Sequence, residues 1–256
     1  MIKIRFLEKV ICELETELFL ILIAIFAGSF VRSAFGFGDA MLSMPILAML
    51  VGLEVAAPLI AIVECMISSV ILSRGWRQVE MRSVWMLVLF SLIGIPVGIY
   101  FLKNLDARLM KLLLAVLIIL FTGWMFFNKR KTRLKNRKLA PLFGLLAGIV
   151  GSAYNTNGPF AVIYGSLRGW DAQKFRATLQ GYFLPVTLFI VTGHAIAGNI
   201  TPEIIKYSGF SIPVVFLAFW LGNKLHHSIQ PEKFRKYVLG LLFVLAVLLM
   251  VNTVFF

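Results

Sequence analysis

Ser152-Ala153-Tyr154-Asn155-Thr156-Asn157-Gly158-Pro159-Phe160 is a run of polar and helix-breaking residues inside one of the most apolar parts of the chain. Lipid offers no hydrogen-bond partner to free backbone groups, so an unwound stretch at membrane depth persists only where it is buried in protein or lines a cavity. A similar interruption, Ser33-Ala34-Phe35-Gly36-Phe37-Gly38-Asp39, occurs in the first half of the chain. We refer to residues 33–39 as the first break and to residues 152–160 as the second break. One break in each half predicts a repeat built around a central site.

The composition is that of an integral membrane protein. Of the 256 residues, 60% are hydrophobic and 14% are charged, and the mean hydropathy is +0.90, far outside the range of soluble domains. Apolar runs close to the length that a bilayer requires lie at 18–34, 55–73, 84–101, 109–127, 139–154, 174–192, 204–222 and 234–256. The sequence therefore predicts an all-α polytopic membrane protein, with about eight to ten membrane segments once two shorter runs are counted.

The two shorter apolar runs, at 40–51 and 158–167, each follow a break. At about 1.5 Å per residue, each would cross only about half of the hydrocarbon core. We expect each to pair with the segment before it, either as the second arm of a broken hairpin or as a shortened span. The sequence leaves both possibilities open.

Basic residues indicate the orientation in the membrane. The net charge of +13 comes from short loops between apolar runs rather than from one face of a soluble domain, so we expect no nucleic-acid partner. Seven basic residues lie in the linker 128–138, which the positive-inside rule places in the cytoplasm. Counting crossings outward places both ends of the chain on the opposite side. The similar stretches 105–111 and 230–236 then open helices on opposite sides, which predicts two inverted repeats.

Four regions follow from this reading. Residues 1–17 form an amphipathic lead-in without the charge pattern or cleavage site of a signal peptide. The first transmembrane repeat occupies 18–127, the basic cytoplasmic linker 128–138, and the second transmembrane repeat 139–256. We expect a multi-pass protein of a prokaryotic inner membrane.

The breaks and the linker resemble a known transporter family. The first break has the form small-Ala-aromatic-Gly-aromatic-Gly, and Gly148 and Gly151 precede the polar residues that lead into Gly158-Pro159. Joined by a basic linker, these features resemble the TauE/SafE sulfite exporter family over nearly the whole chain. The resemblance implies a carrier for sulfur-containing anions such as sulfite, thiosulfate, sulfoacetate and related organosulfonates. Asp39 differs from the family pattern, which more often has glycine or a small residue there.

Arg32 is the only basic residue outside the loops and their flanks, one position before the first break. An arginine at the centre of an isolated helix costs about 2.5–3.5 kcal/mol on insertion scales, so it should face the protein interior with a partner. Its planar set of N–H donors suits an oxyanion such as sulfite or a sulfonate. The alternatives are an internal ion pair with Asp39 or Glu64, or extension of the side chain to a membrane interface.

Asp39 and Glu64 are the acidic residues within the apolar body of the chain, and both are candidates for proton coupling. Glu64 is the stronger candidate, because it lies within an apolar run with Ser68 one turn further on. Asp39 lies where a short helix begins and would cap that helix. A structural role remains open for both acids.

The second break provides amide and hydroxyl groups, and Gly158-Pro159 is a helix start signal. Free N–H groups at a helix start favour an anion. Alternatively, the polar side chains only satisfy the interrupted backbone. The predicted substrate-binding residues are Arg32, Ser33, Gly36, Gly38, Ser152, Asn155, Thr156, Asn157, Gly158 and Pro159.

We expect neither a metal nor a cofactor. Cys12 and Cys65 are the only cysteines, which excludes a disulfide framework and a cysteine metal cluster. His194 and the pair His226-His227 fall in predicted loops, where solvated positions are expected.

These observations predict a secondary transporter that moves a small sulfur-containing anion by alternating access, with proton coupling left open. The nearest alternative is a carrier of a carboxylate or a cation on the same fold. An intramembrane enzyme with Ser152 as nucleophile is less favoured, because a nucleophile needs a base within hydrogen-bond reach and no histidine falls inside the predicted membrane body. The expected partners are the small anion and the lipid bilayer, and the oligomeric state is open.

Overall fold

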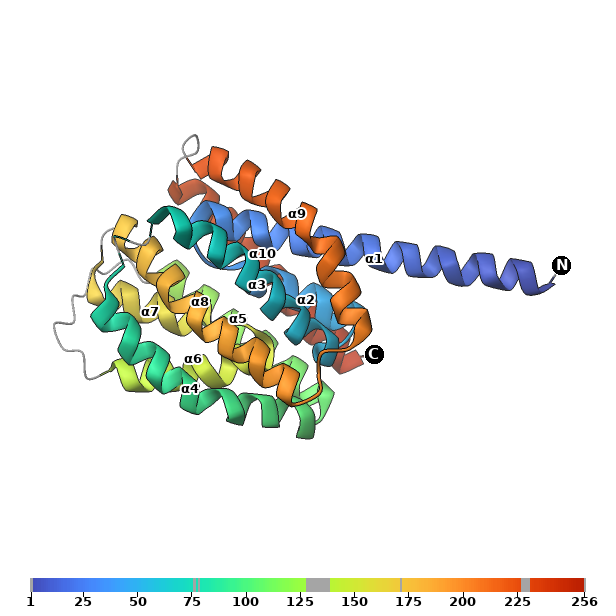
Figure 1. The fold of residues 1–256 in the computed structure, drawn as a ribbon, viewed down its shortest axis with the longest axis horizontal. Helices are drawn as coiled ribbons and strands as arrows, with labels where there is room; N and C mark the ends of the chain where they lie inside the picture. Colours follow the sequence, from blue (N-terminus) through green and yellow to red (C-terminus); the bar gives the residue numbers. More distant parts are fainter. Residues whose placement is uncertain are drawn as a thin grey trace.

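The computed structural model describes residues 2–75, 77, 79–127, 139–170, 172–226 and 231–255, and the basic linker 128–138 lies outside them. All regular secondary structure across these ranges is helical (Figure 1), which confirms the all-α prediction. The helices are α1 (Ile2–Phe35), α2 (Asp39–Leu50), α3 (Leu53–Gly75), α4 (Met81–Asn104), α5 (Ala107–Phe127), α6 (Ala140–Tyr154), α7 (Gly158–Arg168), α8 (Ala172–Ile196), α9 (Pro202–His226) and α10 (Pro231–Phe255).

Seven of the described helices are long and apolar enough to cross a membrane, namely α1 from Thr16 onward, α3, α4, α5, α8, α9 and α10. Large apolar side chains such as Leu89, Ile93 and Leu120 are exposed on their outer faces, as expected for helices that contact lipid. The chain is therefore a polytopic membrane protein. The apolar run at 139–154 differs from expectation, because α6 has only 15 residues and is too short to cross the hydrocarbon core alone.

Both short helices fold back on the helix before them. Ser43 Oγ on α2 donates to the Ala24 carbonyl on α1 at 2.8 Å, so α2 runs antiparallel to α1. In the second half of the chain, the rings of Phe143 on α6 and Tyr164 on α7 lie 6.0 Å apart, so α7 returns along α6 in the same way. Each break is thus the tip of a hairpin. This geometry corresponds to the broken hairpin and not to the shortened span.

The reversal at each tip depends on residues that tolerate a left-handed backbone. Gly36 and Gly38 have φ values of 85° and 100°, and Asn155 has a φ of 49°. Glycine adopts this region without steric cost, and asparagine is among the few other residues that visit it routinely. The breaks are therefore encoded locally by the residue types at these positions.

Glycines bring α4 and α6 into direct backbone contact. A Cβ atom built on Gly144 of α6 would lie 2.6 Å from the Leu87 carbonyl oxygen of α4, and Gly94, Gly98 and Gly148 are equally enclosed by backbone of the opposite helix. Small residues allow such close approach of membrane helices. This crossing fixes α6, and with it the second break, against the body of the protein.

Contacts between helices follow a two-fold pattern. α1 packs on α9 as α4 packs on α6, and α4 packs on α8 as α3 packs on α9. Exchanging α1–α5 with α6–α10 converts each of these pairs into the other, while the contacts α3–α8 and α5–α10 map onto themselves. Both chain ends also lie toward the same end of the bundle (Figure 1). This pattern indicates two structural repeats, and their inversion stays a prediction.

Candidate functional site

Arg32 is the centre of a buried polar cluster. Its Nη1 donates to Asp39 Oδ2 at 2.7 Å and to Glu64 Oε1 at 2.6 Å. Its Nη2 donates to Ser68 Oγ at 2.6 Å and to Gln180 Oε1 at 3.1 Å. Arg32 itself is fully buried, and the other four residues are buried as well. We call these five residues the Arg32 cluster.

The cluster is assembled from four helices. Arg32 lies in the last turn of α1, and the first break turns the chain so that Asp39, at the start of α2, returns beside it. Glu64 and Ser68 lie one turn apart and therefore on the same face of α3. Gln180 comes from α8, whose Phe183 ring lies 4.6 Å from the Arg32 guanidinium carbon. A cation over an aromatic face is stabilised by the ring electrons.

The ion pair that the sequence left open for Arg32 is present with both carboxylates rather than with one. A buried charge is tolerated only when it is paired and hydrogen-bonded. With both carboxylates ionised, one positive and two negative charges leave the cluster with a net charge of −1.

Glu64 connects the two breaks. Its Oε1 accepts from Arg32, which adjoins the first break, and its Oε2 accepts from Asn155 Nδ2 in the second break. Two atoms at the second break, Asn155 Oδ1 and Asn157 Nδ2, are buried without a hydrogen-bond partner among the described residues. The tips of both hairpins thus meet at one carboxylate and leave polar groups available.

The predicted hydroxyl ligands instead bind backbone. Ser33 Oγ donates to the Phe219 carbonyl at 2.9 Å, Ser152 Oγ to the Ile95 carbonyl at 2.9 Å, and Thr156 Oγ1 to the Tyr154 carbonyl at 3.0 Å. These bonds correspond to the alternative in which side chains satisfy an interrupted backbone. The remaining predicted residues lie at the tips, Gly36 and Gly38 in the first and Gly158 and Pro159 at the start of α7.

The predicted substrate-binding residues do not include two residues of α8 that contact the first break. Gln180 Nε2 donates to the Gly36 carbonyl at 2.5 Å, and Arg176 Nη2 donates to the Ser33 carbonyl at 2.6 Å. The spacing of four between Arg176 and Gln180 puts both on one face of α8. α8 is the least hydrophobic of the seven spans. Its two polar residues at this spacing are the sequence signal for a helix face that contacts protein rather than lipid.

The prediction of a solvated loop position for His194 is wrong. α8 continues to Ile196, and His194 is fully buried in its last turn with Nδ1 2.9 Å from Asn199 Nδ2. α8 extends beyond the predicted apolar run 174–192 because its last turn is still packed against the protein. His226 is the last residue of α9, and His227 lies outside the described residues.

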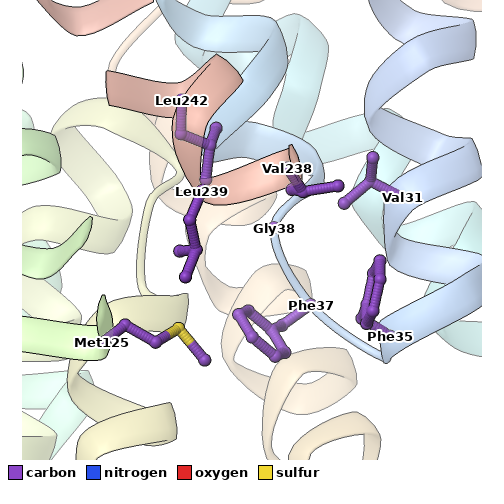
Figure 2. Close-up of a pocket in the computed structure, with 8 residues that line it drawn as sticks. All are labelled: Val31, Phe35, Phe37, Gly38, Met125, Val238, Leu239 and Leu242. Atoms are coloured by element: carbon purple, nitrogen blue, oxygen red, sulfur yellow. The ribbon is translucent and has the colours of Figure 1, made fainter. Parts of the chain in front are cut away.

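A cavity beside the first break is small and apolar. Figure 2 shows Val31, Phe35, Phe37 and Gly38 on one side of it, with Met125 of α5 and three residues of α10 around the rest, Val238, Leu239 and Leu242. Its volume of about 20 Å³ is close to that of a single water-sized probe. No lining side chain offers a charge or a hydrogen bond, so this cavity is not an anion site.

A comparison with protein families matches residues 20–249 to the family described as Sulfite exporter TauE/SafE. The matched range contains both breaks and every residue of the Arg32 cluster. No curated protein and no solved structure matches the chain.

Proposed function

Because the chain belongs to the sulfite exporter TauE/SafE family, we propose that this membrane transporter moves sulfite, thiosulfate or an organosulfonate by alternating access with proton coupling. The observation that carries the proposal is the meeting of both hairpin tips at the Glu64 carboxylate. In transporters built from repeats, interrupted helices of the two halves form the substrate site near the bilayer midplane. The proposal retains a cytoplasmic linker 128–138 and a prokaryotic inner membrane.

Unused donors support an anionic substrate. Arg32 Nε and Asn157 Nδ2 are buried and lack a hydrogen-bond partner among the described residues. A buried donor without a partner costs about 1–3 kcal/mol. The oxygens of sulfite or a sulfonate would satisfy such donors, and an arginine fork matches their geometry.

The charge of the Arg32 cluster supports proton coupling. An anion that approached a cluster of net charge −1 would be repelled. Protonation of Glu64 removes one negative charge and frees a donor position on Arg32 for the anion. The same event weakens the contact between Glu64 and Asn155, so that proton uptake, anion binding and release of the second break are linked.

An asymmetry between the halves supports alternating access. α2 and α10 are in contact, whereas their counterparts α7 and α5 border an apolar groove lined by residues such as Leu117, Phe121, Pro159 and Phe160. Two equivalent hairpins thus have different surroundings. This is expected of a carrier in one of two states that differ by the movement of one repeat against the other.

The test is flux of labelled sulfite and thiosulfate in proteoliposomes, with and without a pH gradient. Wild-type flux should be saturable and stimulated by the gradient, and Arg32→Gln should abolish it in protein that remains monodisperse. Arg82→Gln is the matched control, because Arg82 is exposed at the start of α4. Absence of flux of either anion under every gradient would refute the proposed substrate class.

A second candidate is a cation carrier on the same fold, which the excess negative charge of the Arg32 cluster favours. Competition distinguishes the two. Unlabelled sulfite and thiosulfate should inhibit uptake of labelled sulfite, while exchange of sodium for potassium or choline should leave it unchanged. Transport of a labelled monovalent cation without any added sulfur anion would favour the second candidate.

A further inference from the structure

We propose that Arg176 receives the anion at the cytoplasmic mouth of the pathway, before the anion reaches Arg32. This inference rests on the proposed function and adds a second binding position to it. Arg176 lies in the second turn of α8. Counting crossings from the predicted cytoplasmic linker 128–138, through the α6–α7 hairpin that returns to its starting side, predicts a cytoplasmic position for this end of α8, with Arg168 and Lys174.

Arg176 differs in its pairing from the other basic residues near it. Arg168 and Lys174 lie 3.9 Å and 3.4 Å from the Glu80 carboxylate. Arg176 Nη2 donates to the carbonyl oxygen of Ser33, and no carboxylate among the described residues lies within ion-pair distance of it. The side chain is half-buried. A partly desolvated cation that is paired only with a neutral carbonyl keeps an attraction for anions.

Arg176 also lies directly on the first break. A Cβ atom built on Gly36 would be 2.8 Å from Arg176 Cγ, so the aliphatic part of the arginine covers the tip of the hairpin. Gly36 has a φ of 85°, and both the backbone conformation and this contact require a glycine there. The arginine therefore has a defined position at the entrance to the break.

A continuous set of contacts leads from Arg176 to Arg32. Gln180, one turn along α8, donates to the Gly36 carbonyl and accepts from Arg32 Nη2. One helical turn rises about 5.4 Å, so Arg176 lies about one turn along α8 from Gln180, the residue that contacts Arg32. Since Arg32 is neutralised by two carboxylates and Arg176 by none of the described ones, an anion from the cytoplasm should first bind Arg176 and then move inward when Glu64 is protonated.

A purely structural role is the alternative to be excluded. A cation near the C-terminal end of a helix stabilises that end, and the Ser33 carbonyl is in the last turn of α1. That role would affect folding and transport from both sides equally. An entry role would affect the apparent affinity on one side only. The test therefore needs kinetics that distinguish the two faces of the membrane.

The experiment is side-specific sulfite uptake in proteoliposomes with a defined orientation of the full chain. For Arg176→Gln we expect the KM for sulfite at the cytoplasmic face to rise about tenfold, a typical consequence of losing one charge-assisted hydrogen bond. The maximal rate and the KM at the opposite face should remain within about twofold of wild type, below the effect of one such bond. Lys174→Gln is the matched control, because its charge is paired with Glu80, and it should leave both KM values unchanged.

Each outcome is decisive. An equal loss of maximal rate from both faces without a change in KM, or no change at all, would overturn the proposal for Arg176. If Arg176→Gln does not purify as a monodisperse protein, Arg176→Met replaces it, because methionine keeps an aliphatic side chain over Gly36 and removes the charge. A raised cytoplasmic KM in that variant supports the proposal, and a wild-type KM overturns it. Failure of the proposed function is separate, because wild-type protein would then show no saturable sulfite flux from either face.

Discussion

Arg32 and Glu64 are joined by a hydrogen-bonded ion pair of 2.6 Å between Nη1 and Oε1, although they lie on different helices and neither is exposed. The second oxygen of the same carboxylate accepts from Asn155 of the second break. One acid therefore contacts both hairpin tips. A change in its charge alters the pairing of Arg32 and the attachment of the second break together.

Glu64→Gln should separate binding from coupling. The amide retains the size of the side chain and an acceptor for Arg32, but it cannot exchange a proton. We expect exchange of labelled for unlabelled sulfite to continue, while stimulation by a pH gradient disappears. The measurement is counterflow and gradient-driven flux on the same proteoliposomes. Gradient stimulation equal to wild type would show that the coupling proton does not bind Glu64.

Asp39→Asn should increase the apparent affinity for the anion. The substitution removes one of two negative charges, so the cluster changes from a net charge of −1 to 0 while Glu64 still pairs with Arg32. The repulsion of an incoming anion decreases, and the KM for sulfite should fall several-fold.

Asp106→Asn is the control for Asp39→Asn. Asp106 is exposed and accepts from the Leu109 backbone N–H at the start of α5 at 3.0 Å. It should leave the KM for sulfite unchanged. A KM that rises in Asp39→Asn would indicate that Asp39 holds Arg32 in its binding orientation instead of competing with the anion.

Asn155 combines a side-chain role and a backbone role that two substitutions separate. Its φ of 49° costs about 1–2 kcal/mol for an ordinary L-residue and little for glycine. Asn155→Gly should therefore lose only the Glu64 contact, and with it most transport. Asn155→Ala should lose transport and in addition about 1 kcal/mol of stability. Thermal unfolding in detergent, together with flux, tests both, and equal stability of the two variants would argue against backbone strain.

The close crossing of α4 and α6 should not tolerate a single added methyl group. Gly148→Ala would place Cβ against the Ser91 backbone, and overpacking of this kind costs about 1–3 kcal/mol. We expect a lower unfolding temperature and reduced flux. Gly240→Ala is the control, since nothing lies within 4 Å of a Cβ there, and it should be neutral or slightly stabilising. Equal effects of the two substitutions would mean that the helices separate easily at the crossing.

The membrane class, the order of the helices and the position of both breaks are properties of local sequence. Run lengths of apolar residues predict the spans, and Gly36, Gly38 and Gly158-Pro159 interrupt helices because of their own backbone preferences. Arg32, Asp39 and Glu64 could be singled out for the same reason, because an ionisable residue within an apolar run is costly wherever it faces.

The partners of those residues depend on the tertiary structure. Hydropathy records the cost of moving a side chain out of water but not the direction in which the side chain points, and direction depends on how helices far apart in the sequence pack. For this reason the pairing of Arg32 with both acids, the contact of Asn155 with Glu64, the burial of His194 and the role of α8 in holding the first break could not be derived from the chain alone. The same holds for the choice between a hairpin and a shortened span, because both have the same residues and differ only in the packing of α2 on α1 and of α7 on α6.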